Sequence, residues 1–429
     1  MTARSGILGG MTRAIKVRHV LAVLVTTLVL APPSAKAEAG VLAGAPFGPF
    51  DLSPSPTWTG TWEGAPSGTV PALPGASIRN VVHTSVGGSA ARIRISNRLG
   101  TKPLQLGAVT LALQEPGAPR SPKAVTGSMR TATFKGATKV TIPAGRDLVT
   151  DPVYLPIPAD ANLLISVHTP ADSGPATYHR SAIQANFVAP AGDRTTEESG
   201  TAYTGSLGNW YYVTGVDVLG SSAGSVVALG DSITDGTGSA FSANHRWPDR
   251  LADRIKTLPP SRRLGVLNAG IAGNRLLLEG RGPSALARLD ADVLSRTGVR
   301  VVIVMEGIND LKGSPEQTSP AAFADAYRRI VSRAHARGIR VIGATLTPYG
   351  GHGAYTSARE AVRQKVNAVI RTPGLFDEVV DFDAVVRDPA LPSRIRPAYD
   401  PGDHLHFNDA GMKAMADRID VDTLTPWVS

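Results

Sequence analysis

The sequence predicts two folds in series. Residues 58–220 read as a β-rich domain, and residues 221–429 read as an α/β domain with a doubly wound parallel sheet. In the first part, apolar and polar residues alternate with period two, and Gly and Pro fill the gaps. From residue 221 onward, apolar strand-like runs alternate with helical patterns, which is typical of a parallel sheet covered by helices on both faces. A chain of 429 residues is long enough for two such cores.

Short strands with alternating polarity account for the first domain. The clearest runs are 91–96 and 109–113, and further strands are expected at 139–142, 163–167 and 210–213. Many short strands without helical periodicity predict a β-sandwich or a jelly-roll-like domain. Aromatic residues of this domain either fill the sandwich core or form a sugar-stacking platform. Core packing is favoured because aromatic residues are ordinary strand formers; the residues concerned are Trp58, Trp62, Trp210, Tyr211 and Tyr212.

Five apolar runs predict the strands of the parallel sheet: 226–229, 265–268, 299–305, 339–345 and 378–383. Two helices between them have clear signatures. One begins near Pro320, and its apolar residues fall on a single helix face: Phe323, Ala326, Tyr327, Ile330, Val331 and Ala334. The other is expected to begin at a capping box from Ser357 to Glu360. Its predicted buried face holds Val362, Val366, Val369 and Ile370.

The N-terminus resembles an export signal. Basic residues precede an apolar run at 20–31, and Ala35-Lys36-Ala37 follows as a small-residue cleavage site. The run has twelve residues, well short of the roughly 20 needed to span a bilayer, so a permanent anchor is disfavoured. We therefore expect residues 1–37 to be a signal peptide, residues 38–57 to be a flexible Gly/Pro/Ala-rich tether, and the mature protein to be secreted.

Composition excludes several classes of function. The first 37 residues carry five of the 44 basic residues and no acidic one, which leaves 39 basic and 35 acidic residues, a net charge of +4. The arginines are scattered, so a nucleic-acid partner is not expected. The chain has no cysteine, which excludes disulfides, thiol catalysis and thiolate metal sites. No segment after the leader is apolar enough to span a membrane, so stable membrane insertion is not expected after signal cleavage.

Residues suited to acyl transfer follow three of the predicted strands. Ser232 lies in a glycine-bounded turn after the first, Gly273 in the loop after the second, and Asn309 in the loop after the third. Loops at the carboxyl ends of neighbouring parallel strands converge. More than 170 residues after the serine, Asp403 precedes His406 by three positions. Together these residues offer a nucleophile, a base and donors for an oxyanion.

Alternatives exist for single residues. Ser232 taken alone would be an ordinary turn serine, since Asp, Ser and Gly all favour turns. His404 and His406 could also form a metal site with Asp400, Asp403 and His352. That interpretation is disfavoured because a metal would duplicate the activation that a serine and a base already provide. We therefore expect neither a metal nor a cofactor.

With these residues in view, residues 222–425 resemble the SGNH (GDSL-type) hydrolases, which carry Ser, Gly, Asn and His in four ordered blocks. The resemblance implies a flavodoxin-like five-stranded sheet and a metal-free serine esterase. It implies Ser232 as nucleophile, His406 as base and Asp403 as the residue that orients the base. The oxyanion hole would consist of the Ser232 and Gly273 N–H groups and the Asn309 amide. The pattern Gly-x-Ser-x-Gly is absent around the serine, which argues against the ordinary α/β-hydrolases.

One residue of the hydrolase region departs from the family pattern, and two segments of the β-rich region extend the resemblance. Phe407 stands where the family often has proline, a departure we expect to be minor. The segments 78–88 and 94–100 also resemble a β-rich module that precedes the hydrolase domain in a group of secreted members.

The sequence thus predicts a secreted serine ester hydrolase that acts on short-chain acyl or acetyl esters, including sugar esters. The expected partner is an ester substrate such as an acylated polysaccharide or lipid. A lipase acting on longer acyl chains is the alternative, and a non-catalytic glycan-binding protein is an alternative of another class. The complete set of five site residues counts against the glycan-binding alternative. Loss of a single catalytic residue is enough to reduce activity severely, so a protein without catalytic activity would usually lack at least one of them. The oligomeric state stays open.

Overall fold

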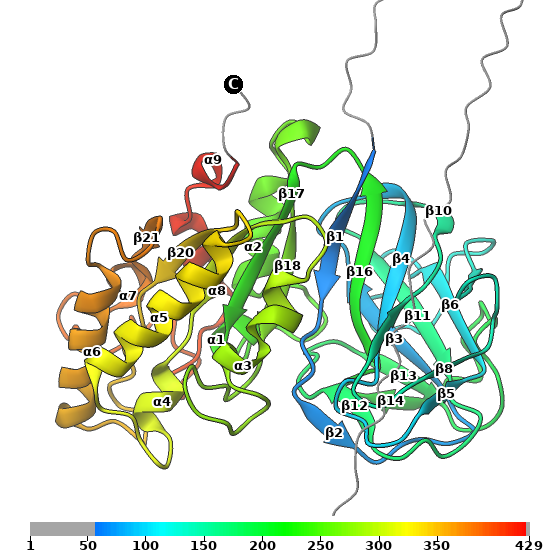
Figure 1. Ribbon diagram of the computed structural model, residues 1–429, viewed down its shortest axis with the longest axis horizontal. Helices are drawn as coiled ribbons and strands as arrows, with labels where there is room; N and C mark the ends of the chain where they lie inside the picture. The colour runs from blue at the N-terminus through cyan, green and yellow to red at the C-terminus, as the bar shows by residue number, and fades with distance from the viewer. Residues whose placement is uncertain (1–55, 426–429) are drawn as a thin grey trace, which may run out of the picture. The chain divides into compact units, whose positions relative to one another are not determined.

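The computed structural model describes residues 56–425, which belong to one compact unit (Figure 1). The predicted signal peptide at 1–37 lies outside the described residues, as does the predicted tether at 38–57 except for its last two residues. The architecture changes near residue 220. Antiparallel strands end with β16 (Val213–Gly220), and parallel strands separated by helices begin with β17 (Gly224–Gly230). A domain boundary at 220/221 stays a prediction, because both regions belong to the same compact unit.

The β-rich region is built from antiparallel strand pairs. One sheet has the order β1-β16-β4-β10 with β9 beside β4, and a second has the order β14-β13-β3-β11-β6-β7. Two smaller sheets have the orders β15-β12-β2 and β5-β8. The strands before β16 are β1 (Thr57–Glu63), β2 (Gly68–Val70), β3 (Ser77–His83), β4 (Gly88–Ser96), β5 (Leu104–Leu106), β6 (Ala108–Leu113), β7 (Arg130–Ala132), β8 (Val140–Ile142), β9 (Asp147–Val149), β10 (Val153–Ile157), β11 (Asn162–His168), β12 (Ala176–His179), β13 (Asn186–Ala189), β14 (Gly205–Leu207) and β15 (Trp210–Tyr211).

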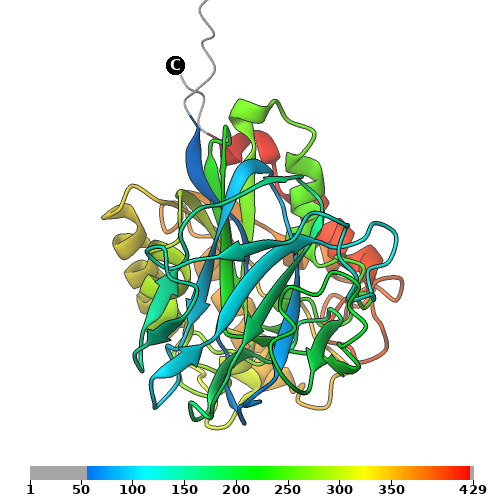
Figure 2. The same ribbon diagram turned by 90° about the vertical axis from the view of Figure 1, so that its right-hand side faces the viewer.

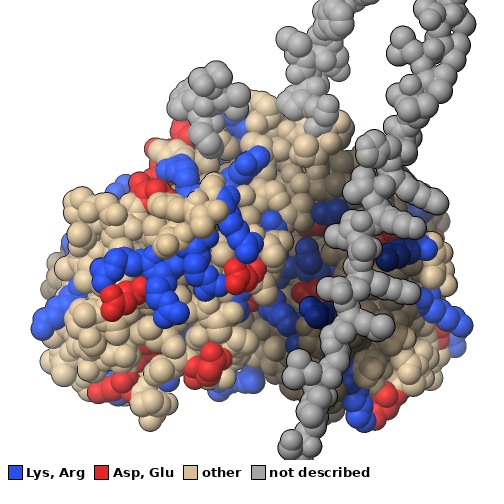
Figure 3. Space-filling model, in the orientation of Figure 1, with Lys and Arg blue, Asp and Glu red and all other residues tan. Residues whose placement is uncertain are grey.

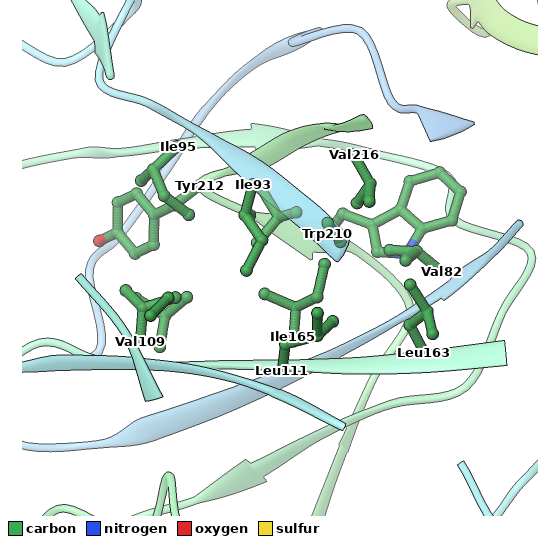
Figure 4. Close-up of a cluster of buried hydrophobic side chains, with 14 of the residues drawn as sticks. Val82, Ile93, Ile95, Val109, Leu111, Leu163, Ile165, Trp210, Tyr212 and Val216 are labelled. Carbon is green, nitrogen blue, oxygen red and sulfur yellow. The ribbon is translucent and has the colours of Figure 1, made fainter. Parts of the chain in front are cut away.

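The two large sheets pack face to face. Figure 2 shows the molecule with the strands of the β-rich region toward the viewer. Ile93, Ile95 and Val216 from one sheet meet Leu111 and Ile165 from the other in a shared apolar core (Figure 4). The predicted sandwich is therefore present. All five predicted strand runs form strands, but the run 210–213 is divided into β15 and β16. The break falls at Tyr212, whose φ of +61° is incompatible with a continuous strand.

The aromatic residues of this region serve mainly as core. Trp62, Trp210, Tyr211 and Tyr212 are all buried, and the Trp62 and Trp210 rings meet edge to face at 4.9 Å. Trp58 is half-buried beneath the guanidinium of Arg92. Because four of the five rings are enclosed, these residues do not form an open stacking platform, as the strand pattern predicts.

The second region contains a parallel sheet with the strand order β18-β17-β19-β20-β21. This is the flavodoxin-like order, in which the first strand of the sheet in chain order, β17, lies between the second, β18, and the third, β19. The remaining strands are β18 (Leu264–Gly270), β19 (Val299–Met305), β20 (Arg340–Ala344) and β21 (Glu378–Val380). Each lies within about two residues of its predicted position, except β21, which ends at Val380 rather than at residue 383.

Helices cover both faces of this sheet. Val227 and Leu229 of β17 face a core shared with α3, α5 and α6, whereas Val226 and Ala228 face a core shared with α2, α7 and α8. The helical segments are α1 (Ser232–Asp235), α2 (Trp247–Ile255), η1 (Pro260–Arg262), α3 (Ala285–Leu289), η2 (Asp290–Leu294), α4 (Ile308–Lys312), α5 (Pro320–His335), α6 (Ser357–Ile370), α7 (Phe382–Val386), α8 (Asp409–Arg418) and α9 (Val421–Leu424).

The two predicted helices are present, with one correction. The predicted face of α5 is buried apart from the half-buried Val331. The cap of α6 is Thr356, whose side chain accepts from the Arg359 N–H, so the capping box predicted at Ser357 is wrong by one residue. Its buried face is also rotated from the prediction. Arg363 and Asn367 are buried there, because Asp383 and the Leu346 backbone pair with them inside the protein.

The β-rich region lies against the free edge of the parallel sheet. β18 is the last strand on that side, and its Val266 N–H donates to the Ser85 hydroxyl at 2.8 Å. The backbone of β1 also comes close, because the Ser225 hydroxyl donates to the Gly60 carbonyl at 3.2 Å. Gly265 permits this approach, since an added Cβ would lie 1.9 Å from the Gly60 oxygen. Sheet and sandwich are thus joined through buried backbone contacts.

Lys and Arg side chains gather over the α/β part of the face in Figure 3, with Asp and Glu among them. Ion pairs join several cations of the α/β region to acidic side chains: Arg333 and Arg337 both contact Asp290, and Arg328 contacts Asp325. Between residues 56 and 425 there is no helix with the length and apolar character needed to cross a bilayer.

Candidate active site

The carboxyl ends of β17, β18 and β19 carry the three predicted loops. Ser232 opens α1 directly after β17, Gly273 follows β18, and Asn309 lies in α4 after β19. With His406 they line one cleft of about 640 Å³. The structure therefore brings together residues that are up to 174 positions apart in the chain.

Ser232, His406 and Asp403 form a continuous hydrogen-bonded chain. The His406 Nε2 lies 2.8 Å from the Ser232 Oγ, and its Nδ1 lies 2.6 Å from the Asp403 Oδ2. The other carboxylate oxygen of Asp403 accepts from the backbone N–H groups of Leu405 and His406. Burial alone would raise the pKa of Asp403, but these hydrogen bonds outweigh it and hold the pKa below its ordinary value. An ionised Asp403 in turn favours the tautomer with hydrogen on Nδ1 and a free lone pair on Nε2.

The turn that carries His406 is fixed at both ends. Asp400 accepts from the backbone N–H groups of Gly402 and His404, and its other oxygen lies 2.5 Å from the His404 Nδ1. Phe407, where the family often has proline, is fully buried in the core beneath α8. His404 is half-exposed and does not line the cleft.

Three hydrogen-bond donors face the space beside Ser232. Within residues 56–425, neither the Ser232 N–H nor the Gly273 N–H donates to a protein acceptor. The amide of Asn309 has two hydrogens, and one of them goes to the Asn274 carbonyl at 2.8 Å. Gly273 has a φ of +81°, and a side chain there would also meet Arg281. All three positions named by the sequence therefore retain donor capacity at the cleft.

Buried carboxyl groups surround the loop that carries the nucleophile. Asp231 caps α1 by accepting from the Ile233 N–H, and burial raises its pKa to about 6. Glu306 is also buried, and burial together with the charges of Asp231 and Asp310 raises its pKa well above the ordinary value. Asp310 itself accepts from the Leu276 and Leu277 N–H groups and so supports the loop after Gly273. These carboxyls shape the site without lining its cleft.

The alternative metal site is not formed by the described residues. Across residues 56–425 no group of three or more His, Asp or Glu side chains is arranged to hold a metal ion. Asp400 and Asp403 each pair with the histidine of their own turn instead.

Several side chains that hold these loops are not predicted from the sequence. Asp235 accepts from the Ala272 N–H beside Gly273, and Arg288 donates to Gly230 and Ala269 at the ends of β17 and β18. Asp235 lies in the same turn as Ser232, so its proximity could have singled it out. His179 contacts Asp235 from the β-rich region, 56 positions away, and no local pattern marks it.

Residues 228–414 match the family model described as the GDSL-like lipase/acylhydrolase family. No curated protein matches the chain.

Several solved structures are similar to parts of this chain. They include a GDSL-like lipase from Bacteroides thetaiotaomicron, with 21% identity and a TM-score of 0.36, over 46% of this chain and 86% of that one. An acetyl xylan esterase from Geobacillus stearothermophilus has 21% identity and a TM-score of 0.35, over 45% and 90%. A family two carbohydrate esterase from Cellvibrio japonicus has 11% identity and a TM-score of 0.35, over 87% and 95%.

At TM-scores below 0.5 these similarities say nothing about the substrate of this chain. The family match, by contrast, spans the loops that carry Ser232, Gly273, Asn309 and His406. Residues 228–414 therefore form a domain of the GDSL-like lipase/acylhydrolase family, a family of carboxylic ester hydrolases.

Proposed function

We propose that the protein hydrolyses esters through an acyl-enzyme on Ser232. The observation that carries the proposal is the contact of 2.8 Å between the Ser232 hydroxyl and the His406 Nε2, continued to Asp403. His406 takes the hydroxyl proton as the serine attacks the ester carbonyl, and Asp403 stabilises the resulting imidazolium. His406 then gives that proton to the departing alcohol, and water activated by the same imidazole releases the acid.

The oxyanion of the tetrahedral intermediate is held by the Ser232 and Gly273 N–H groups and by the Asn309 amide. These donors belong to three loops that the sheet fixes in advance, so they need no rearrangement when negative charge develops.

The lining of the cleft favours a short acyl group on a polar alcohol. Apart from Ala272 and glycines, its described residues are all polar or charged, and three are cationic: Arg275, Arg281 and Lys312. Each CH₂ of a long acyl chain gains about 0.8 kcal/mol when it is buried against apolar surface, and no described lining residue of this cleft except Ala272 has an apolar side chain. Sugar hydroxyls, by contrast, can hydrogen-bond to such a lining. We therefore favour acetyl esters of carbohydrates over long-chain lipid esters.

Labelling of Ser232 tests the reaction. The full chain should react with a fluorophosphonate on the peptide that carries Ser232, and Ser232→Ala should lose both labelling and hydrolysis. A folded native protein that neither labels nor hydrolyses short-chain esters, but binds glycans, would instead support the non-catalytic alternative.

A chain-length series tests the substrate class. Chromogenic esters from acetate to palmitate are compared with acetylated xylan, and kcat/KM should fall as the acyl chain lengthens. A strong preference for palmitate would establish the lipase alternative.

We also propose that the protein is exported. The support is the basic and apolar pattern of residues 1–37. N-terminal sequencing of protein recovered outside the cell should then begin near Glu38, whereas an intact N-terminus on cell-bound protein would contradict export.

A further inference from the structure

His179 reaches the catalytic region from the β-rich region. It ends β12, and its side chain is almost completely enclosed. Its Nδ1 lies 2.7 Å from the Ala65 carbonyl, and its Nε2 lies 3.0 Å from the Asp235 Oδ1. A carbonyl oxygen only accepts hydrogen bonds, so Nδ1 must carry a hydrogen; an ionised Asp235 requires one on Nε2 as well. The contacts thus fit a protonated ring paired with a buried carboxylate.

The charge state of the ring agrees with these contacts. Burial by itself would lower the pKa of His179, but the charge and hydrogen bond of Asp235 outweigh burial and the pKa is raised. The positive charge of Arg246 opposes the protonated form, and the centroid of the Trp210 ring lies 5.2 Å from that of the imidazole.

Asp235 connects this histidine to the oxyanion loop. It ends the short helix that Ser232 opens, and its second oxygen accepts from the Ala272 N–H at 2.9 Å. Ala272 directly precedes Gly273. The loop also packs tightly on the helix, because an added Cβ at Gly270 would lie 2.2 Å from the Asp235 nitrogen. A shift of Asp235 would therefore move the Gly273 donor relative to Ser232.

A second buried connection leads from the β-rich region to the other donor loop. Arg98 pairs with Asp292 at 2.6 Å, and Asp292 lies 3.4 Å from Arg288. The Arg288 Nε donates to the Asn274 side chain at 2.9 Å. The backbone carbonyl of that same Asn274 is the acceptor for the Asn309 amide. Arg288, Asp292 and Asn274 are all buried, so water does not screen these contacts.

We propose that the β-rich region is part of the catalytic apparatus, with His179 and Arg98 acting as positioning residues for the two oxyanion donors, Gly273 and Asn309. This inference rests on the proposed function. Neither residue touches the substrate. Each fixes the placement of a donor through one or more buried partners, and the chemistry depends on that placement because a displacement of about 1 Å can cost a factor of 10² in rate.

Two substitutions of His179 separate positioning from simple structural support. The amide nitrogen of Gln reaches about as far from the backbone as Nε2, so His179→Gln keeps a donor toward Asp235. The shorter His179→Asn keeps a donor only toward Ala65. We expect kcat for a chromogenic acetate ester to fall roughly 10- to 100-fold in His179→Asn and to stay within about threefold of native in His179→Gln. KM should change by less than about twofold in both, because the ground-state contacts of the ester are intact.

His168→Asn is the matched control. The Nδ1 of His168 also bonds a backbone carbonyl of the β-rich region, that of Ala76 at 3.0 Å, but His168 lacks the second contact, to Asp235, that His179 makes. The kcat of the His168→Asn variant should equal that of the native chain. Thermal unfolding is measured for every variant to show that it is folded. Native kcat in folded His179→Asn, or equal losses in the Asn and Gln variants, would overturn the inference.

Arg98→Gln provides a second test if His179→Asn does not fold. It removes the nearest of the three guanidinium groups that contact Asp292 and should also lower kcat at constant KM; an unchanged kcat would overturn the inference. The native chain distinguishes the two proposals. If it does not hydrolyse esters, the proposed function fails, whereas an active native chain with unaffected variants defeats only the positioning role.

Discussion

Removal of the Asn309 amide should be the most informative single change at this site. In the native chain one amide hydrogen is donated to the Asn274 carbonyl at 2.8 Å, and the second is available at the cleft. Asn309→Ala removes a donor that acts on charge present only in the transition state. Loss of one such donor costs about 10²- to 10³-fold in kcat, equivalent to about 3 to 4 kcal/mol. KM should change little, because the substrate carbonyl carries no full charge.

The assay measures kcat and KM on a short-chain chromogenic ester, with thermal unfolding in parallel. The lost bond to Asn274 should reduce the free energy of unfolding by about 1 kcal/mol. Asn309→Asp should be less active than the alanine variant, because a carboxylate at this position repels the oxyanion and cannot donate to it.

Asn367→Ala controls for the loss of a buried amide. Asn367 also donates to a backbone carbonyl, that of Leu346 at 2.9 Å, but lies away from the cleft. Because the Asn367 side chain also accepts from the Leu346 N–H at 2.8 Å, this variant should lose at least as much stability as Asn309→Ala, and it should keep native kcat. A folded Asn309→Ala variant whose kcat is within tenfold of native would refute the assignment of this amide to the oxyanion hole.

Two further substitutions probe the carboxyl groups of the site. Asp403→Asn should lower kcat by roughly 10³- to 10⁴-fold with little change in KM, since a neutral amide cannot stabilise the imidazolium; steady-state kinetics on the same ester would show this, and native turnover would contradict it. Asp231→Asn should change how stability depends on pH. The native carboxyl has its pKa raised from 3.8 to about 6 by burial, so the folded state binds its proton more tightly than the unfolded state, and the native chain loses stability as pH rises from about 4 to 6. Above that window the penalty is about 3 kcal/mol, and the amide, which can still accept from Ile233, avoids it. Unfolding midpoints at pH 4 and pH 8 should therefore diverge between variant and native chain, and parallel curves would show that Asp231 carries no such penalty.

Hydrophobic periodicity predicts most of this fold. The runs at 226–229 and 299–305 alternate between two buried faces, and each becomes a central strand of the parallel sheet. The positions of the catalytic loops can also be predicted from the sequence, because the carboxyl ends of neighbouring parallel strands converge. In both cases the information is local and repeats along the chain.

Periodicity fails where the interior is polar. On α6 it selects Val362 and Val369 for the buried face, yet Arg363 and Asn367 are the enclosed residues. A buried arginine is acceptable there only because Glu360 and Asp383 neutralise it, and Asp383 lies 20 positions away. The same limit applies to His179 and Arg98, whose partners are distant in sequence. Such pairs leave no pattern in a single sequence.

The contact between Ser85 and Val266 has a consequence for any attempt to work with the hydrolase region alone. β18 is the outermost strand of its sheet, and an outer strand with free N–H and C=O groups is a template for pairing with another molecule. In the whole chain the sandwich occupies that border. A fragment starting at residue 221 would expose the edge of β18, together with the carboxylates of Asp235 and Asp292 that His179 and Arg98 neutralise. We expect such a fragment to self-associate rather than to yield a smaller soluble enzyme.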